Sequence, residues 1–269
     1  MSGKGFHPFK GRVSKHFGDT LQPDDAYLSY YDVRLMKEDI DTLKNNDWLT
    51  DNCIAFWEEY LEREELKLYP SSHIVLLRPT MAFMLMKTPD ALTLREALPN
   101  FTKTTHIFLP INNAQNVTRP EEGTHWSLLL VSILDGVAFH YDSLTQHNYR
   151  DAYHATNQLS VLLGKPLRFM DLQDSPKQTN SSDCGVYVCI LMRHLLLKKL
   201  LSANAREKVS MSMGGKLVDA AGGRKEIFRT IEGFRKEGER RRSHEESRSS
   251  SPFGKSKSHD SKSPPRIDS

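Results

Sequence analysis

The segment QTNSSDCGVY, residues 178–187, places a cysteine at the point where a polar turn gives way to a long apolar run. Cys184 stands between Asp183 and Gly185, and Ser and Asp residues are typical of helix starts. Unpaired backbone N–H groups and a partial positive charge at a helix start favour thiolate over thiol. The pattern therefore predicts a reactive cysteine at the beginning of a buried helix that extends over 186–201.

Three further residues, two of them outside this segment, complete a set for nucleophilic catalysis. His125 can act as a base, Asp142 as the acid that orients it, and Gln178 as a side-chain amide donor to an oxyanion. Each has an ordinary alternative: Cys184 as an inert core cysteine, His125 at a strand end, Asp142 in a turn and Gln178 on a surface loop. If all four ordinary readings held, a nucleophile, a base, an acid and an amide donor would stand together at the ends of elements by chance. A catalytic site is the simpler explanation.

The remaining cysteines, Cys53 and Cys189, show no spacing typical of a metal site or a redox pair. An odd count of three argues against a disulfide framework and favours a reducing intracellular compartment, the cytoplasm or nucleus or both. No cofactor or metal is expected. The N-terminus has no apolar signal core, and Arg193 and His194 interrupt the longest apolar run, so no membrane segment is expected.

Composition divides the 269 residues into a domain over 27–238 and two tails. Residues 1–26 are expected to be a disordered lead-in, and residues 239–269 a disordered basic tail rich in Ser and Arg. The tail holds eight Lys/Arg against five Asp/Glu, which is as large an excess as the net charge of +3 of the whole chain. Because the middle of the chain has no basic stripe, nucleic-acid binding is not expected. The run Arg240–Arg242 fits either a solvated tail or a nuclear-localisation element.

Alternating helix and strand signals predict an α+β domain with one sheet and helices packed about it. Expected strands lie at 73–77, 106–111, 127–134, 137–141 and 167–172, and expected helices begin at Thr50 or Asp51, near Pro79 and at about 224.

The hairpin at Asp135-Gly136 presents a geometric problem for the catalytic pair. A two-residue turn there would place Asp142 opposite Leu129, with His125 about 13 Å further along the strand. Contact between His125 and Asp142 therefore requires another register, a bulge, or a loop that folds back.

These residues resemble the motifs of the SUMO and neddylation-modifier proteases, the sentrin-specific family of cysteine peptidases. The resemblance covers roughly 27–238 and includes the element DWLTD at 47–51, in which Thr50 stands where the family has Asn. It implies a papain-like cysteine protease core, in which a central mixed sheet is flanked by helices and a buried helix carries the nucleophile. The compact length, the segment 27–35 and the weak final helix are most similar to the deneddylase.

The resemblance also implies roles for the residues. Cys184 attacks the carbonyl of the C-terminal glycine of a ubiquitin-like modifier, His125 moves the proton, Asp142 orients His125, and Gln178 serves the oxyanion hole. Trp48 and Trp126 are expected to form the walls of a narrow tunnel for a Gly-Gly tail, and Asp51 to help bind that tail. The expected partners are the neddylation modifier and its conjugates, such as cullins, and the protein is expected to be a monomer.

Three alternatives remain open from the sequence. SUMO also ends in Gly-Gly, so the tunnel does not distinguish a desumoylating enzyme. Bacterial effector acetyltransferases resemble the same catalytic fold, although no acetyl-coenzyme A signature is visible. A non-catalytic modifier-binding module would not need the complete catalytic set.

Overall fold

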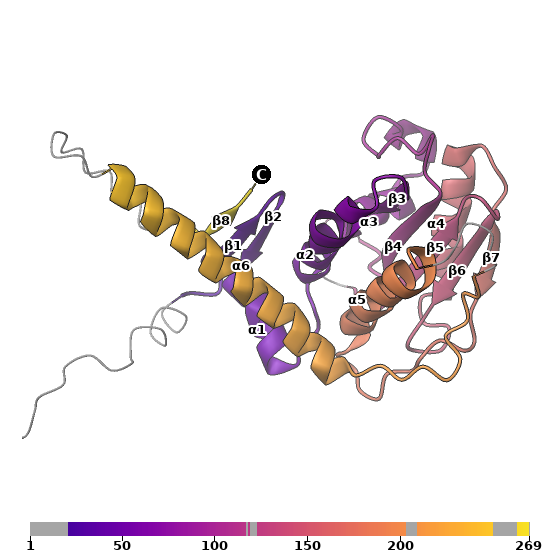
Figure 1. Cartoon of the computed structure of the whole chain (residues 1–269). Helices are drawn as coiled ribbons and strands as arrows, with labels where there is room; N and C mark the ends of the chain where they lie inside the picture. The colour runs from indigo at the N-terminus through magenta and orange to yellow at the C-terminus, as the bar shows by residue number, and fades with distance from the viewer. Residues whose placement is uncertain (1–20, 117, 119–122, 203–208, 250–262, 269) are drawn as a thin grey trace, which may run out of the picture.

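The structure is a computed structural model that describes residues 21–116, 118, 123–202, 209–249 and 263–268. A mixed sheet of five strands, in the order β3-β4-β5-β6-β7, forms its centre (Figure 1). The strands are β3 (Ile74–Leu76), β4 (His106–Asn112), β5 (Trp126–Ser132), β6 (Val137–Tyr141) and β7 (Arg168–Asp171). The main helices are α1 (Lys37–Asn45), α2 (Asp51–Tyr60), α3 (Pro79–Lys87), α4 (Tyr149–Leu163), α5 (Cys184–His194) and α6 (Ala220–Ser249). Short helical segments lie at Leu61–Glu65, Leu66–Leu68, Ala91–Leu94 and Leu195–Leu200.

Helices cover both faces of this sheet, so its central strand is buried on both sides. In β5, Leu128 and Leu130 pack in one core with α2 and α5, whereas Leu129 and Val131 pack in a second core with α3 and α4. Alternate side chains of a strand point to opposite faces, which explains why every residue of β5 is buried. The expected α+β arrangement with a buried nucleophile helix is present.

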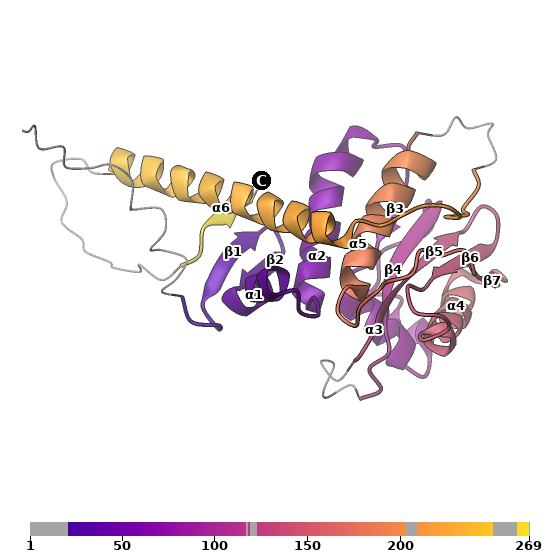
Figure 2. The same cartoon turned by 90° about the horizontal axis from the view of Figure 1, so that it is seen from below.

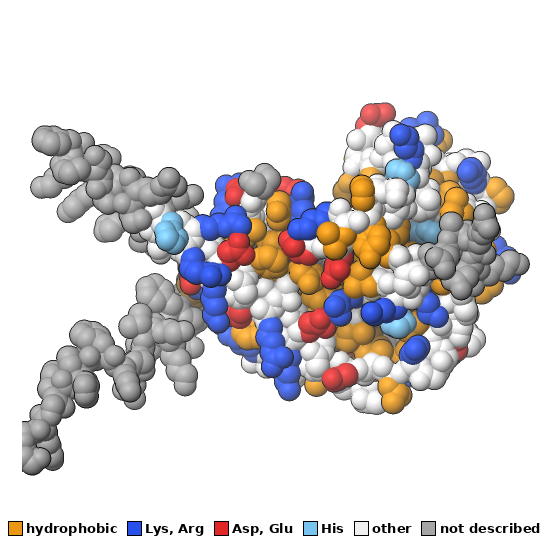
Figure 3. Space-filling model, viewed as in Figure 1, with side chains coloured by type: hydrophobic (Ala, Val, Ile, Leu, Met, Phe, Trp, Pro, Cys, Tyr) orange, Lys and Arg blue, Asp and Glu red, His pale blue; other side chains and the backbone are white. Residues whose placement is uncertain are grey.

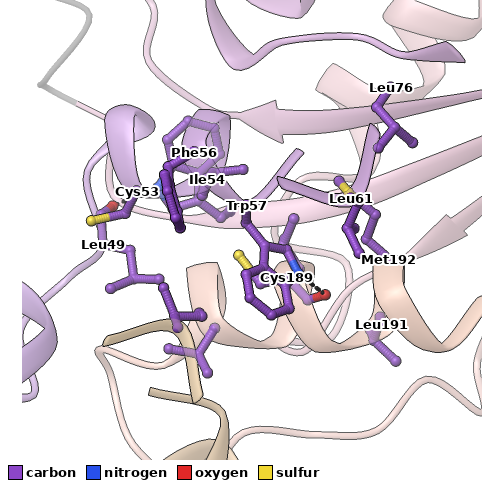
Figure 4. Close-up of a cluster of buried hydrophobic side chains, with 14 of the residues drawn as sticks. Leu49, Cys53, Ile54, Phe56, Trp57, Leu61, Leu76, Cys189, Leu191 and Met192 are labelled. Atoms are coloured by element: carbon purple, nitrogen blue, oxygen red, sulfur yellow. Dashed lines mark hydrogen bonds between the residues drawn. The ribbon is translucent and has the colours of Figure 1, made fainter. Parts of the chain in front are cut away.

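Helix α2 begins as the sequence suggests, and it packs against α5. Thr50 is the N-cap, with its hydroxyl accepting from the backbone N–H of Cys53. The indole of Trp57 donates to the backbone carbonyl of Cys189 at 3.0 Å. Figure 4 shows these two residues in contact across the helix pair, among leucine and methionine side chains. This contact fixes the helix that carries Cys184 against a rigid neighbour.

The hairpin between β5 and β6 has a different register from a two-residue turn. Ser132 pairs with Val137 and Leu128 pairs with Tyr141, so the loop contains four residues. Continuing this register places Asp142 opposite position 127, and His125 lies only about 7 Å beyond at strand rise. A change of register, one of the three solutions that the sequence left open, therefore brings the catalytic pair together.

A second, small sheet lies at the N-terminal side of the molecule, in the order β2-β1-β8 (Figure 2). Its strands are β1 (Ala26–Tyr30), β2 (Val33–Met36) and β8 (Arg266–Ile267). The parallel strand β8 is held to β1 by hydrogen bonds from Ser29 N to Pro265 O at 2.9 Å and from Tyr31 N to Ile267 O at 2.7 Å. Ile267 is buried in the same core as α2 and α5.

This sheet and α6 differ from the disordered tails that the sequence predicted. In the C-terminal tail expected over 239–269, α6 continues to Ser249 and residues 265–267 return to the domain. In the lead-in expected over 1–26, residues 22–25 form a turn that bonds to the start of α1. Residues 1–20 and 250–262 lie outside the described part. Strand β8 forms by pairing with β1, a strand that is distant in the sequence, and local composition does not reveal such a pairing.

Helix α6 runs along the small sheet and extends beyond it (Figures 1 and 2). Ile227 and Ile231 face the core, as the predicted amphipathic helix over 224–236 requires. Lys or Arg and Asp or Glu side chains are interspersed along it on the face shown in Figure 3.

Two neighbouring glutamates of α2, Glu58 and Glu59, are both buried but differ in whether they form ion pairs. Glu58 is fully buried, and neither of its carboxyl oxygens has a hydrogen-bond partner in the described part of the chain. Burial raises the pKa of Glu58 well above its ordinary value of 4.5, although the positive charge of Arg78 opposes this. Glu59 is also buried, but it forms ion pairs with Arg63 and Arg78.

We expect Glu58→Met to raise the free energy of unfolding at pH 8 by about 1–3 kcal/mol, because it removes a buried carboxyl group that has no hydrogen-bond partner among the described residues. A carboxyl group whose pKa is raised on folding binds its proton more tightly in the folded state. The wild-type protein therefore loses stability as pH rises above the ordinary glutamate value toward the raised one. The advantage of the variant should be large at pH 8 and small near pH 4.5, as measured by urea unfolding.

The control is Glu59→Met, which leaves two arginines without their shared carboxylate. It should destabilise the protein at pH 8. A loss of stability in Glu58→Met as large as that in Glu59→Met would contradict this account of Glu58.

Candidate active site

The loop before α5 presents Cys184 as the first residue of that helix. The Asn180 side-chain oxygen accepts from the backbone N–H groups of Ser182 and Asp183, each at 3.0 Å. The Asp183 backbone carbonyl then accepts from Tyr187 N at 2.9 Å and starts the helix. The polar residues of the sequence motif therefore close a tight turn that ends at the thiol.

Gly185 lets two other segments approach the nucleophile closely. A Cβ atom at this position would lie 3.0 Å from the Leu49 Cβ and 3.5 Å from the Trp126 Cδ1. The indole of Trp126 in turn donates to the Leu49 carbonyl at 3.2 Å. A Cβ at Gly185 would be in ordinary contact with Trp126 but too close to Leu49, so it would push the 48–49 segment away from Cys184.

His125 and Asp142 form a buried hydrogen-bonded pair. The His125 Nε2 lies 2.6 Å from the Asp142 Oδ1, and both side chains are almost fully buried. The other ring nitrogen, Nδ1, makes no direct hydrogen bond in the described part of the chain. It is thus the nitrogen left to exchange a proton with Cys184.

The electrostatics of this pair favour a charged imidazole. Burial lowers the pKa of His125, but interactions with Asp142 and then with Cys184 outweigh it and raise the pKa to about 9. Burial raises the pKa of Asp142, but hydrogen bonds from His125 and from the Asn148 backbone hold that pKa below its usual value. An imidazolium beside an ionised carboxylate is the state that stabilises a thiolate and later protonates a leaving amine.

Backbone groups fix Asp142 in place. The Leu144 N–H donates to Oδ1 at 2.9 Å and the Asn148 N–H donates to Oδ2 at 3.0 Å. Lys177, from the segment that leads to the nucleophile loop, donates to the Asp142 carbonyl at 2.9 Å. The acid is therefore oriented before any substrate binds.

Two asparagines that the sequence did not single out support the base. Asn148 is fully buried, and its amide donates to the carbonyls of Ile111 and His125. The Asn113 side-chain oxygen accepts from the backbone N–H groups of Thr124 and His125 at 2.7 and 3.1 Å. Asn113 directly follows β4 and Asn148 directly precedes α4, and both are positions at which asparagine is common.

Gln178 is held with its amide nitrogen directed toward the nucleophile loop. Its backbone N–H donates to the Ser143 carbonyl at 3.1 Å, and its side-chain oxygen accepts from the Ser143 hydroxyl at 2.5 Å. The amide nitrogen donates to the Asn180 carbonyl at 2.7 Å. An amide has two N–H donors, so a second one is available to an oxyanion.

We expect Gln178→Ala to lower kcat by roughly 100- to 1,000-fold, because an oxyanion donor acts mainly in the transition state. KM should change much less. Steady-state kinetics on a fluorogenic modifier substrate would measure both values. The control is Ser143→Ala, which removes only the bond that orients the amide and should cost less. An equal loss of kcat in both variants would contradict direct action by Gln178.

A pocket of about 440 Å³ brings the remaining predicted residues to the nucleophile. Its lining includes Cys184, His125, Trp48, Trp126 and Asp51. Trp48 is about half exposed, and its indole donates to the Ser181 carbonyl at 2.6 Å, whereas Trp126 is buried. The Trp48 indole is thus bonded to the Ser181 carbonyl and the Trp126 indole to the Leu49 carbonyl. These bonds give the pocket fixed aromatic walls. A larger cavity of about 890 Å³, between residues 95–105 and 162–165, contains none of these residues.

A second chain of Ser, His and Asp side chains crosses the sheet but is not a site. His140 bonds to Asp171 at 2.8 Å and to Ser127 at 2.9 Å. Ser127 is buried and, unlike Cys184, does not line the pocket that holds the catalytic residues, so a substrate in that pocket does not meet its hydroxyl. These residues link β5, β6 and β7.

No group of three or more His, Cys, Asp or Glu side chains in the described ranges could hold a metal ion. No helix within those ranges is both long and apolar enough to cross a membrane.

Comparison with known proteins points to one family. The Ulp1 protease family, C-terminal catalytic domain, matches residues 47–214. NEDD8-specific protease 2 of Schizosaccharomyces pombe is 37% identical over 209 residues, which cover 76% of this chain and 50% of that relative. NEDD8-specific protease 1 of the same yeast is 33% identical over 68% of this chain and 44% of its own length. The chain therefore spans about half the length of these two relatives. Probable sentrin-specific protease 8 of Dictyostelium discoideum is 31% identical over 69% of this chain and 80% of its own.

Solved structures agree on the fold. The C-terminal Ulp1 protease domain, determined in complex with Smt3, the yeast ortholog of SUMO, has a TM-score of 0.58 at 19% identity. The similarity covers 80% of this chain and 90% of that one. This confirms the papain-like α+β fold that the sequence predicted.

Proposed function

Since the chain belongs to the Ulp1 protease family, we propose that it is a thiol-dependent hydrolase that cleaves after the C-terminal Gly-Gly of a ubiquitin-like modifier. The observation that carries this proposal is the His125–Asp142 pair at 2.6 Å, whose histidine lines one pocket with a cysteine at a helix start. Such an arrangement supplies a nucleophile, a base and its orienting acid for acyl transfer.

The reaction proceeds in two steps through a covalent intermediate. The Cys184 sulfur attacks the carbonyl carbon of the terminal glycine, and negative charge develops on the carbonyl oxygen. The Gln178 amide and the Cys184 backbone N–H stabilise this oxyanion. The imidazolium of His125 protonates the leaving amine, which departs and leaves a thioester. His125 then takes a proton from water, which attacks the thioester and releases the modifier.

The pocket walls account for selection of a Gly-Gly tail. Trp48 and Trp126 line the approach to Cys184, and their indoles are held by backbone carbonyls. A side chain at the last two substrate positions would clash with these rings. Asp51, at the start of α2 and on the same pocket, is placed to help hold the tail.

The neddylation modifier, NEDD8, is the proposed substrate, because the two yeast relatives are named NEDD8-specific proteases. Its conjugates, such as cullins, and its precursor are the proposed targets, and the protein is proposed to act as a monomer. We place this activity inside the cell, in the cytoplasm, the nucleus or both. Three cysteines without a disulfide, one of them the nucleophile, suit a reducing compartment.

SUMO is the second candidate, because the solved Ulp1 domain with the same fold was determined in complex with Smt3. Both candidates would present Gly-Gly to Cys184, so any preference must reflect differential binding of the globular body.

The test is a panel of electrophilic probes built at the C-termini of NEDD8, SUMO and ubiquitin. The NEDD8 probe should label Cys184 fastest. Chimaeras that exchange bodies but keep the tails should carry the preference with the body. Faster labelling by SUMO would overturn the choice of modifier but not the protease activity. No labelling by any probe, with acetyl transfer from acetyl-coenzyme A instead, would favour a same-fold acetyltransferase.

A further inference from the structure

Arg224, on α6, reaches the loop that precedes the nucleophile. The residue lies outside the family match at 47–214, and it is only 3% exposed. Its Nε donates to the Asp183 Oδ1 at 2.8 Å, and its Nη2 lies 2.7 Å from the same oxygen. Nη2 also donates to the Ser182 carbonyl at 3.0 Å. The guanidinium therefore holds both residues that come directly before Cys184.

The third nitrogen of the same guanidinium holds the end of α1. Nη1 donates to the Thr42 carbonyl at 3.0 Å, which also accepts from the backbone N–H of Asp47 at 3.0 Å. The next residue is Trp48, whose indole returns to the Ser181 carbonyl at 2.6 Å. These bonds form a closed ring that joins α6, the nucleophile loop and one wall of the pocket.

We propose that Arg224 is a positioning residue that sets the nucleophile loop against the Trp48 wall. The expected effect on kcat rests on the proposed function. A planar guanidinium with five donors in a fixed fork can hold three acceptors from two segments at once, whereas a lysine ammonium is a point charge on a flexible stem. Misplacement of the thiol by about 1 Å can cost roughly 100-fold in rate.

Arg224 also balances charge beside the thiol. Asp183 carries a carboxylate one residue before Cys184, and Asn180 donates to its other oxygen at 2.7 Å. Arg224 is the buried cation bonded to this carboxylate in the described part of the chain, and without it the negative charge would disfavour the thiolate. Loss of the guanidinium should therefore reduce the reactivity of Cys184 even when no substrate is present.

The kinetic test compares Arg224→Met with Arg235→Met in the full chain. Arg235 is a matched control because it is also buried on α6, but it stacks on Tyr27 at 3.9 Å and bonds to Glu239, away from the nucleophile loop. Arg224→Met should lower kcat roughly 10- to 100-fold, while binding of the modifier in a Cys184→Ala background changes less than about threefold. Arg235→Met should lower the Tm but leave kcat within about twofold. Arg224→Lys should restore only part of kcat.

A second measurement needs no modifier and so separates this proposal from the proposed substrate. The rate at which iodoacetamide alkylates Cys184 is followed against pH by mass spectrometry. In Arg224→Met the profile should move to higher pH, and in Arg224→Met/Asp183→Asn it should move back. An unchanged profile together with a kcat within about twofold of wild type would overturn the proposal. So would an equal loss of kcat in Arg224→Met and Arg235→Met.

Discussion

Replacement of Cys184 by alanine should abolish hydrolysis of a modifier conjugate, with a loss of at least about 10,000-fold in kcat, while binding of the modifier persists. The thiol is only 1% exposed at the base of the pocket, so it supplies the reaction rather than contact area. The inactive variant should therefore form a stable complex with the modifier. Single-turnover cleavage and isothermal titration with the same modifier measure the two properties.

Cys189 provides the matched control within the same helix. It is fully buried, and burial raises the pKa of its thiol well above the ordinary value, so it stays protonated. Its contact with Trp57 uses the backbone carbonyl, which alanine retains. Cys189→Ala should keep kcat within about threefold and lose little stability, since only one small group leaves the core. Burial also raises the pKa of Cys53 to about 12, so neither thiol can replace Cys184. Appreciable turnover in Cys184→Ala would show that Cys184 is not the nucleophile.

Asp142→Asn should have the second largest effect, a loss of roughly 1,000- to 10,000-fold in kcat. The substitution keeps the shape of the side chain but removes the charge that holds His125 as an imidazolium. In the wild type, kcat/KM should decline as pH rises through about 9, where His125 loses its proton. In the variant this alkaline limb should move down toward the ordinary histidine value of 6.5. A pH–rate profile of residual activity measures the shift.

Asp171→Asn is the control for this change, because Asp171 makes the same kind of bond to a buried histidine on the neighbouring strand. It lies outside the catalytic pocket, so kcat and the alkaline limb should stay near the wild-type values. An alkaline limb in Asp142→Asn that stays near pH 9 would show that Asp142 does not raise the pKa of His125.

The nucleophile helix was predictable because its signals are local, whereas Trp48, Asp51 and Trp126 were expected only from the resemblance to the family. The polar turn before Cys184, the glycine after it and the apolar run that follows lie within one short stretch. The register of the β5–β6 hairpin was not predictable from the sequence, because the dipeptide Asp-Gly suggests a two-residue turn. A type I′ turn needs positive φ at both central residues, and here Gly136 has φ of 63° while Asp135 is not among the residues with positive φ. Instead, the Ser132 hydroxyl donates to the Asp135 carboxylate at 2.6 Å and supports a longer loop.

Helix α4 was missed because most of its buried residues are small or polar, with Leu159 as the exception. Ala152, Ala155 and Thr156 give little hydrophobic periodicity, yet the helix begins beside Asn148, which orients Asp142. The positions of Asn113 and Arg224 depend on contacts between segments that are distant in the sequence, so no local pattern could indicate them. Sequence signals thus identified the reacting groups, whereas the residues that hold them in place emerged from the fold.

The parallel pairing of β8 with β1 has a consequence for the order of events during synthesis. Ser29 and Tyr31 bond to Pro265 and Ile267, which are made more than two hundred residues later. On the ribosome, the five-stranded sheet and α5 can pack before β8, the partner on one edge of β1, exists, because chains tend to fold from the N-terminus as they emerge. The edge of β1 therefore stays open throughout translation of the catalytic domain. An open strand edge can pair with other nascent chains, so a nascent chain that stalls before residue 265 is the form most exposed to aggregation.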